Sequence, residues 1–263
     1  MNCARTEGVD DSRTPGRHVF KGGIADITAV ILAGGLGTRL RSVVPDYPKV
    51  LAPINGRPFL TYVLDQLESF GFRKVIFCTG FAADKVEAAF GYKYGNISIG
   101  YSNETTPLGT GGAVHKAREL ISSDVFFLLN GDSFVAADFT EYWRWFESQR
   151  IQASLLLAEV PDRKRFGSVE FESCDKISAF IEKGAESGPG WINAGVYILD
   201  KEVIGSFLPD QAFSLEKDLF PGLIENGLYG FRAKAAFIDI GTPESYRRAA
   251  DFFATCRQVG RRK

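Results

Sequence analysis

The chain predicts an α/β fold with a mixed, mainly parallel sheet flanked by helices, and three observations support this. Strand and helix patterns alternate from residue 27 to residue 121. The apolar run at residues 27–33 is typical of a strand buried on both faces, and residues 124–129 give the most apolar strand pattern of the chain. From residue 153 to residue 182 the strand patterns follow one another closely enough to pair antiparallel. Helices on both faces of a parallel sheet are therefore expected in the first half.

The length of 263 residues is close to the upper limit for a single hydrophobic core. We therefore expect one domain over residues 27–263, with a first half at 27–150 and a second half at 151–250. Residues 1–26, which include His18, are polar and lack the apolar core of a signal peptide. They are predicted to form a disordered tail.

The composition excludes several classes of function. Lys and Arg number 31 against 32 Asp and Glu, so no global field attracts nucleic acid or a membrane surface. No apolar run approaches the ~20 residues that span a bilayer. The four scattered cysteines lack C-x-x-C spacing, which favours a reduced, cytoplasmic setting. Only two histidines exist, so carboxylates, lysines and arginines are the candidate catalytic groups.

A glycine-rich loop, Gly-Gly-Leu-Gly-Thr-Arg at residues 34–39, follows the first strand pattern. Glycine has no Cβ, so the backbone N–H groups of such a loop can approach a phosphate chain. Arg39 adds a planar cation beside them. The loop is predicted to bind a nucleoside triphosphate; a plain flexible turn is the alternative. A dinucleotide fingerprint is excluded by the missing third glycine, and a P-loop by the missing Gly-Lys pair.

A proline-rich segment, residues 45–53, comes next and carries Lys49. Its prolines exclude a regular helix and are expected to hold Lys49 on a stiff, extended stretch near the glycine loop. A solvated loop lysine is the alternative. The following patterns predict a helix from Pro58 to Gly71, a strand at 74–79, a helix at 82–90 and a strand at 97–101.

A second glycine-rich turn, residues 104–112, opens into a predicted helix at 113–121. The N-terminus of that helix can hold a phosphate or the polar edge of a base. A helix-start loop without a ligand is the alternative. His115 lies in this helix and is expected at the surface.

The most apolar strand, residues 124–129, is expected at the centre of the sheet and leads to Asp132. Ligands of open parallel sheets lie beyond the carboxyl ends of the strands, so Asp132 should lie beside the first glycine loop. A carboxylate next to a triphosphate suits Mg²⁺. A simple turn residue is the alternative.

In the second half, a helix at 139–150 carries aromatic residues that we assign to the core, and strands are predicted at 153–160, 167–172, 176–182 and 191–199. Asn193 lies inside an apolar strand and needs a partner, either a hydroxylated ligand or a neighbouring backbone. Thr242 and Pro243 are typical of a helix start. Asp239, just before that start, is a candidate second metal carboxylate.

The ordered motifs L-A-G-G-L-G-T-R-L, P-K-V-L-A-P-I, P-L-G-T-G-G-A, N-G-D, F-G, E-K, N-A-G-V-Y and D-I-G-T-P resemble the sugar-1-phosphate nucleotidylyltransferases over residues 27–250. The segments R-S-V-V and A-P-I-N-G-R-P-F-L look most like the D-glycero-α-D-manno-heptose 1-phosphate guanylyltransferases. The resemblance implies a Rossmann-like sheet of the nucleotide-diphospho-sugar transferase type. It also implies a Mg²⁺-dependent reaction of a nucleoside triphosphate with a sugar 1-phosphate, giving a nucleotide sugar and pyrophosphate. Val50 departs from the motif, where many relatives have a second proline.

The resemblance also assigns roles to residues. Arg39 would steady the leaving pyrophosphate and Lys49 the reacting phosphates, while Asp132 and Asp239 would bind Mg²⁺. The positions that correspond to nucleotide contacts are Leu32, Gly34, Gly35, Gly37, Thr38, Glu104, Gly109 and Thr110. Those that correspond to sugar-phosphate contacts are Gly167, Glu182, Lys183 and Asn193.

The base and the sugar stay open at this point. The Glu104 carboxylate can accept both N1–H and N2–H₂ of guanine, which favours GTP, although it is compatible with uridylyl transfer. The alternatives are a mannose-1-phosphate guanylyltransferase, a uridylyl- or thymidylyltransferase for another hexose 1-phosphate, and a regulatory nucleotide-sugar sensor. A nicotinamide-dependent oxidoreductase is disfavoured by the missing third glycine. The expected partners are the two substrates, and the oligomeric state is open.

Overall fold

The computed structural model describes residues 22–35, 37, 40, 43–44, 47–172, 175–181, 184, 187–208 and 210–260, with the backbone alone over 257–260. Most of the predicted tail lies outside these residues. Its last part, Ile24–Asp26, forms a short 3-10 helix (η2), and Ile24 packs against the core. The expected tail boundary at residue 26 therefore falls within folded chain.

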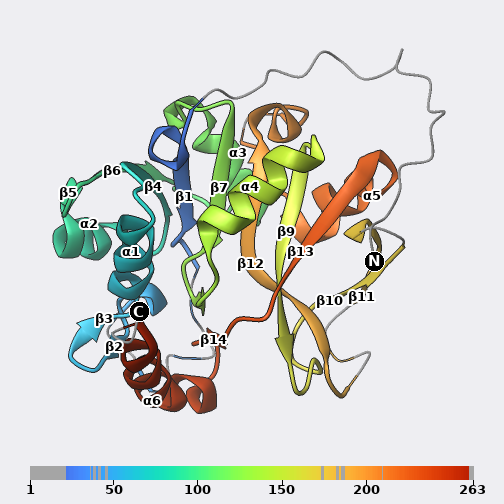
Figure 1. Ribbon diagram of the computed structural model, residues 1–263. Helices are drawn as coiled ribbons and strands as arrows, with labels where there is room; N and C mark the ends of the chain where they lie inside the picture. The colour runs from blue at the N-terminus through green and yellow to red at the C-terminus, as the bar shows by residue number, and fades with distance from the viewer. Residues whose placement is uncertain are drawn as a thin grey trace.

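One ten-stranded sheet forms the centre of the molecule (Figure 1). Its parallel part has the order β7 (Val125–Asn130), β1 (Thr28–Leu32), β4 (Lys74–Thr79) and β6 (Ile97–Asn103). A two-residue strand, β5 (Lys93–Tyr94), pairs antiparallel with β6. The parallel strands and the central position of β7 confirm the predicted fold class.

The second half extends this sheet with antiparallel strands. β12 (Gly190–Asp200) pairs with β7 on one side and with β9 (Ala153–Val160) on the other. β13 (Leu228–Ala233), which was not predicted, runs parallel to β9. β10 (Ser168–Phe171) pairs with β11 (Ile177–Ile181) as expected. The expectation that residues 153–160 also pair with these two strands is wrong, because β12 and β13 take both edges of β9.

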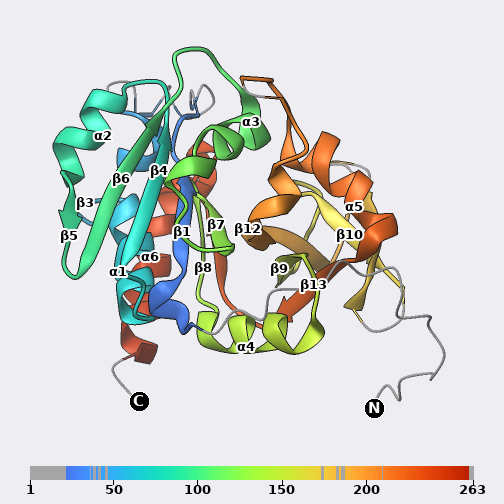
Figure 2. The same cartoon turned by 90° about the horizontal axis from the view of Figure 1, so that it is seen from above.

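Helices cover both faces of the sheet, and strand alternation separates the two cores. Ala29 and Ile31 point into the core under α1 (Leu60–Ser69), α4 (Phe139–Gln149) and α6 (Pro243–Gly260). Val30 points into the core under α3 (Gly109–Lys116) and α5 (Phe220–Gly227). Figure 2 shows α3 and α4 on opposite sides of the sheet. The predicted burial of the aromatic stripe on α4 is confirmed.

The helix α3 begins earlier than the sequence indicates. It starts at Gly109, not at Ala113, and a 3-10 turn (η4, Arg118–Leu120) follows it. The second glycine cluster is therefore the first turn of the helix. A Cβ on Gly111 would lie 2.1 Å from the Phe213 ring, and one on Gly112 would lie 2.6 Å from the Gln211 carbonyl oxygen. These glycines let residues 211–213 pack against the helix.

Shorter elements complete the fold. Lys49 begins a 3-10 turn (η3, Lys49–Leu51) after Pro48, so the expected extended stretch ends one residue earlier. Among the described residues, the other helices are α2 (Ala83–Phe90), the 3-10 turn η6 (Lys201–Ile204) and the π-helix η7 (Leu215–Leu219). Two small sheets pair β2 (Pro53–Ile54) with β3 (Arg57–Pro58), and β8 (Ser133–Val135) with β14 (Phe237–Asp239).

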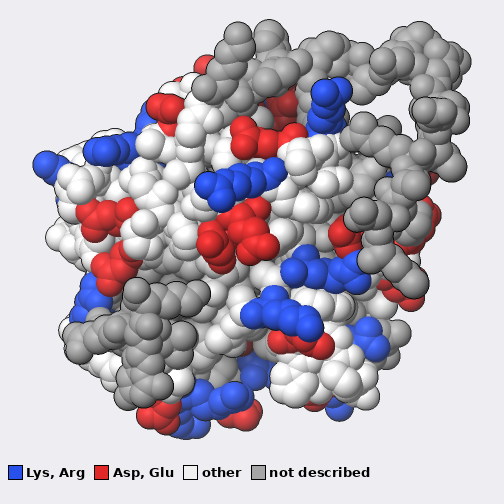
Figure 3. Space-filling model, in the orientation of Figure 1, with Lys and Arg blue, Asp and Glu red and all other residues white. Residues whose placement is uncertain are grey.

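The surface agrees with the balanced composition. On the face in Figure 3, acidic and basic side chains of the described residues alternate over short distances. Within the described part of the chain, none of the helices combines the length and the apolar character that a membrane crossing needs.

Candidate active site

The strand order reverses beside β1. From β1 the chain places β4 and then β6 on one side, and β7 on the other. Ligands of such sheets lie at this switch point, beyond the carboxyl ends of the strands. Gly131, directly after β7, donates its N–H to the Leu32 carbonyl at 2.9 Å. A Cβ on Gly131 would lie 2.5 Å from that oxygen, so glycine is needed to place Asp132 here.

The small sheet of β8 and β14 brings the two predicted metal carboxylates together. Asp239 lies opposite Ser133, the residue after Asp132. The Ile240 N–H donates to the Asp132 carbonyl at 2.9 Å. Two segments more than a hundred residues apart in the sequence therefore end at the same place.

Lys49 pairs with one of these carboxylates and lies near the other. Its ammonium group forms an ion pair with Asp132, and only 13% of its side chain is exposed. A Cβ on Gly241 would lie 3.2 Å from Lys49 Nζ and 2.6 Å from Asp239 Oδ2. The Gly241 N–H donates to Asp239 Oδ2 at 3.0 Å. Gly37 packs on the aliphatic part of Lys49. A Cβ added to Gly37 would lie 3.2 Å from Lys49 Cβ.

Arg165, which was not predicted, is a second cation at this place. Its Nη2 lies 3.3 Å from Asp239 Oδ1 and donates to Thr242 Oγ1 at 3.1 Å. It precedes the F-G motif by one residue, and nothing in its local pattern indicates that it reaches β14.

The carboxylates fit a magnesium ion by their chemistry. Two aspartates from the protein leave the remaining positions to water and phosphate oxygens, which is the arrangement Mg²⁺ favours. Asp132 Oδ1 has no hydrogen-bond partner among the described residues, and 42% of the Asp132 side chain is exposed. A ligand can therefore reach this carboxylate.

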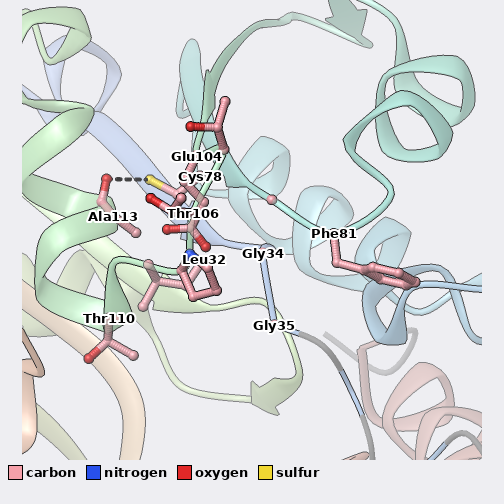
Figure 4. Close-up of a pocket in the computed structure, with 13 residues that line it drawn as sticks. Leu32, Gly34, Gly35, Cys78, Phe81, Glu104, Thr106, Thr110 and Ala113 are labelled. Atoms are coloured by element: carbon pink, nitrogen blue, oxygen red, sulfur yellow. Dashed lines mark hydrogen bonds between the residues drawn. The ribbon is translucent and has the colours of Figure 1, made fainter. Parts of the chain in front are cut away.

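A pocket of about 460 Å³ lies beyond the carboxyl ends of β1, β4 and β6 (Figure 4). Six of the predicted nucleotide contacts line it: Leu32, Gly34, Gly35, Glu104, Gly109 and Thr110. Residues that were not predicted complete the lining: Cys78, Gly80, Phe81, Thr105, Thr106, Pro107 and Ala113. The size of the pocket suits a nucleoside.

Glu104 is held at the wall of this pocket. Its Oε2 accepts the Leu108 N–H at 3.1 Å. Gly34 and Gly80 lie against Glu104 Oε1. A Cβ added to Gly34 would lie 3.1 Å from this oxygen, and one added to Gly80 would lie 2.9 Å from it. The carboxylate therefore rests against backbone that only glycine leaves open. Next to it, burial raises the pKa of the Cys78 thiol, and the negative charge of Glu104 raises it further.

Two of the four predicted sugar-phosphate contacts, Gly167 and Asn193, meet at the edge of β10 and β12. The Asn193 N–H donates to the Gly167 carbonyl at 3.0 Å. The Asn193 side chain donates to the Tyr197 hydroxyl and accepts the Gly195 N–H, both at 2.9 Å. Neighbouring groups of the chain thus supply the partners that this half-buried amide needed. Glu182 and Lys183 follow β11, which pairs with β10, but they lie outside the described residues.

A chain of hydrogen bonds joins the two halves of the site. Glu216, on η7, accepts the Thr110 hydroxyl at 3.0 Å and the Tyr197 hydroxyl at 3.4 Å. Burial raises the pKa of Tyr197 well above its ordinary value, and the nearby charge of Glu216 adds to this. The pocket residue Thr110 is therefore connected through Glu216 and Tyr197 to Asn193.

The chain was compared with known protein families, and the match covers the segments that form this site. The model of one protein family, described as nucleotidyl transferase, matches residues 28–255. This chain belongs to that family.

Relatives of this nucleotidyl transferase include guanylyltransferases. It is 40% identical to D-glycero-α-D-manno-heptose 1-phosphate guanylyltransferase of Aneurinibacillus thermoaerophilus, over 84% of this chain and 96% of the relative. It is 34% identical to mannose-1-phosphate guanylyltransferase of Mycobacterium tuberculosis, over 85% of this chain and 64% of that protein. The solved structure of HddC from Yersinia pseudotuberculosis, also known complexed with GMP-PN, is 36% identical with a TM-score of 0.78. That match covers 86% of this chain and 99% of HddC.

Two parts of the nucleotidyl transferase site were not predicted from the sequence: the pocket residues at the end of β4, and the pair Glu216 and Arg165. The lining residues Cys78, Gly80 and Phe81 lie at and just beyond the carboxyl end of β4, so the rule that ligands lie beyond the strand ends could have indicated them. Glu216 and Arg165 carry no such local signal. Of the predicted residues, Thr38 and Arg39 lie outside the described part of the chain, together with the Glu-Lys pair after β11.

Proposed function

We propose that this nucleotidyl transferase moves a guanylyl group from GTP to D-glycero-α-D-manno-heptose 1-phosphate, releasing pyrophosphate. The observation that carries the proposal is the meeting of Asp132, Lys49 and Asp239 beside the nucleoside pocket. The 40% identity to a heptose 1-phosphate guanylyltransferase over nearly its whole length supports the choice of substrates.

The chemistry needs no general base. A phosphate oxygen of the sugar 1-phosphate is already anionic at neutral pH and attacks the α-phosphorus of GTP. The bond from the α-phosphorus to the bridging oxygen breaks, and pyrophosphate leaves with that oxygen. Rate acceleration then depends on alignment of the two phosphates and on neutralisation of their charge. The scarcity of histidine is compatible with this reaction.

The charged residues divide this work. Lys49 would hold the α-phosphate or the incoming phosphate, and Arg39 the leaving pyrophosphate. Asp132 and Asp239 would hold Mg²⁺, which when bound neutralises phosphate charge. Lys49 is mostly buried and paired with Asp132, so its ammonium group is already at the proposed metal site before the substrates arrive.

Specificity would arise in two places. Glu104 presents a carboxylate to the pocket, and a carboxylate can accept both donors on the Watson–Crick edge of guanine. Gly167, Asn193, Glu182 and Lys183 would contact the sugar phosphate. The hydrogen bonds that fix the Asn193 amide favour a preformed sugar site. The scattered free thiols, among them Cys78 and Cys256, support a cytoplasmic setting.

Pyrophosphate release over a grid of triphosphates and sugar 1-phosphates tests the proposal. We expect the highest kcat/KM with GTP and the heptose 1-phosphate. Highest activity with mannose 1-phosphate would favour the second candidate, which the 34% identity to a mannose-1-phosphate guanylyltransferase supports. Activity with UTP or dTTP alone would reject the guanylyl assignment. Nucleotide-sugar binding without any turnover would indicate a sensor.

A further inference from the structure

Arg165 is held on the Asp239 carboxylate by several contacts, although the function proposed above gives it no role. Its guanidinium pairs with Asp239, donates to Thr242 and lies 5.6 Å from the centroid of the Phe166 ring. Phe166 packs edge-to-face on Phe237 of β14, with centroids 5.4 Å apart. The loop that carries Arg165 is therefore fastened to the strand that carries Asp239.

Each of the two predicted metal carboxylates is paired with one cation. Asp132 has Lys49 as its counter-ion, and Asp239 has Arg165. A divalent ion that approaches the free protein therefore meets two carboxylates whose charge is already neutralised. Ions bind to protein carboxylates largely through that charge, so the two cations oppose the ion.

The two cations differ in how they can respond to a substrate. Lys49, with 13% of its side chain exposed, cannot be left without an anion, because an unpaired buried charge is costly. Arg165, with 39% exposed, can turn towards a phosphate, whose geometry its planar fork matches. A triphosphate and a sugar phosphate supply the anions that both cations need once the carboxylates are released.

We propose that Lys49 and Arg165 are exchangeable counter-ions of the two metal-binding carboxylates. In the free protein they keep divalent ions away from Asp132 and Asp239. When substrate binds, they move to phosphate oxygens, so the ion binds together with the triphosphate and not before it. The inference rests on the proposed function and adds Arg165 to the phosphate-binding residues.

Binding of Mn²⁺ to the intact protein without nucleotide, followed by electron paramagnetic resonance, tests this. Arg165→Gln should bind Mn²⁺ at least about tenfold more tightly than the wild type, as expected for loss of one nearby positive charge. Arg165→Lys keeps the charge and should resemble the wild type. Arg57→Gln is the matched control, since Arg57 forms a similar ion pair with Asp65, at 2.9 Å, away from the site. With saturating GTP present, the advantage of Arg165→Gln should disappear.

Equal Mn²⁺ affinity of the free wild type and Arg165→Gln would overturn the inference. So would a gain that persists in Arg165→Gln/Asp239→Asn, because the ion would then lie elsewhere. The grid of substrates separates this outcome from failure of the proposed function. If the wild type forms the nucleotide sugar but Arg165→Gln binds Mn²⁺ no more tightly, only the exchange of counter-ions is rejected. If Arg165→Gln binds Mn²⁺ more tightly but the wild type forms no nucleotide sugar, only the proposed reaction is rejected.

Discussion

At the scale of single residues, the site depends on glycines at which other groups come close. Gly131 touches the end of β1, Gly241 lies against Asp239 and Lys49, and Gly195 adopts a φ of 74° beside the Asn130 side chain. Each of them leaves space that a Cβ would fill. The catalytic groups can therefore stand closer together than segments with side chains would allow.

Gly131→Ala tests this dependence. The new methyl group would meet the Leu32 carbonyl at 2.5 Å and Val50 Cγ1 at 3.0 Å, so the turn that carries Asp132 must shift. We expect the free energy of unfolding to fall by about 2 kcal/mol, as for other overpacked sites, and kcat/KM to fall more than about tenfold. Urea denaturation and pyrophosphate release measure the two effects. Gly222→Ala, where no atom lies within 4 Å of the added Cβ, is the control and should change neither adversely.

Asp132→Asn removes one charge at the proposed metal site and little volume. The Asp132 side chain is 42% exposed, so the fold should persist, with some loss of stability because Lys49 loses its counter-ion. We expect turnover to fall by about 10²-fold or more, because the developing phosphate charge loses part of its stabilisation. Circular dichroism and pyrophosphate release check fold and rate in the same sample. Near-normal turnover in a folded variant would reject the metal role of Asp132.

At the scale of secondary structure, the short ribbon of β8 and β14 decides where Asp239 lies. The ribbon has only three residue pairs, and it is anchored by Ile238, which is 7% exposed in the core under α6. Figure 1 shows β14 between α6 and the antiparallel strands. A small hydrophobic contact thus controls the position of one carboxylate.

Ile238→Ala should therefore affect both stability and catalysis. We expect the free energy of unfolding to fall by about 2–4 kcal/mol, as for other large-to-small core changes. At temperatures well below the midpoint of unfolding, kcat/KM should still fall by about tenfold because β14 loses its anchor. Ile97→Ala removes the same atoms from a fully buried position at the start of β6, at the other end of that strand from the pocket. It should lower stability without a comparable loss of activity; equal losses in both variants would contradict the role of the ribbon.

At the scale of the whole molecule, one continuous sheet carries both halves of the site. The parallel strands supply the nucleoside pocket, and the antiparallel extension through β12 supplies the predicted sugar contacts. The hydrogen bonds from Thr110 through Glu216 and Tyr197 to Asn193 cross between them. Binding in one half is therefore expected to stabilise the complete domain.

A thermal-shift series tests this expectation. A ligand that binds only the folded state stabilises it by about 2.7 kcal/mol at a hundred times its dissociation constant. For a domain of this size that corresponds to a rise in Tm of about 5–10 °C. We expect GTP with Mg²⁺ to produce such a rise, and UTP at the same concentration a smaller one. Chelation of Mg²⁺ should reduce the effect of GTP, and an equal shift with UTP would contradict the role given to Glu104.

The local pattern of the sequence determined the parallel half of the fold. The four parallel strands and the longer helices from β1 to α4 follow from apolar periodicity and from glycine and proline at their ends, which act over a few residues. The order of strands then requires the loops after β1 and β7 to meet. The pocket contacts in residues 32–35, together with Asp132, could therefore be expected at one place.

Tertiary structure alone decided the remainder. The contact of Asp239 with Arg165, the parallel pairing of β13 with β9, and the position of Glu216 between Thr110 and Tyr197 all join residues far apart in the chain. Such contacts depend on how complete elements pack, and packing leaves no period or motif in the neighbouring residues. The early start of α3 has the same origin, because its glycines Gly111 and Gly112 are explained by the close approach of Phe213 and Gln211, about a hundred residues away.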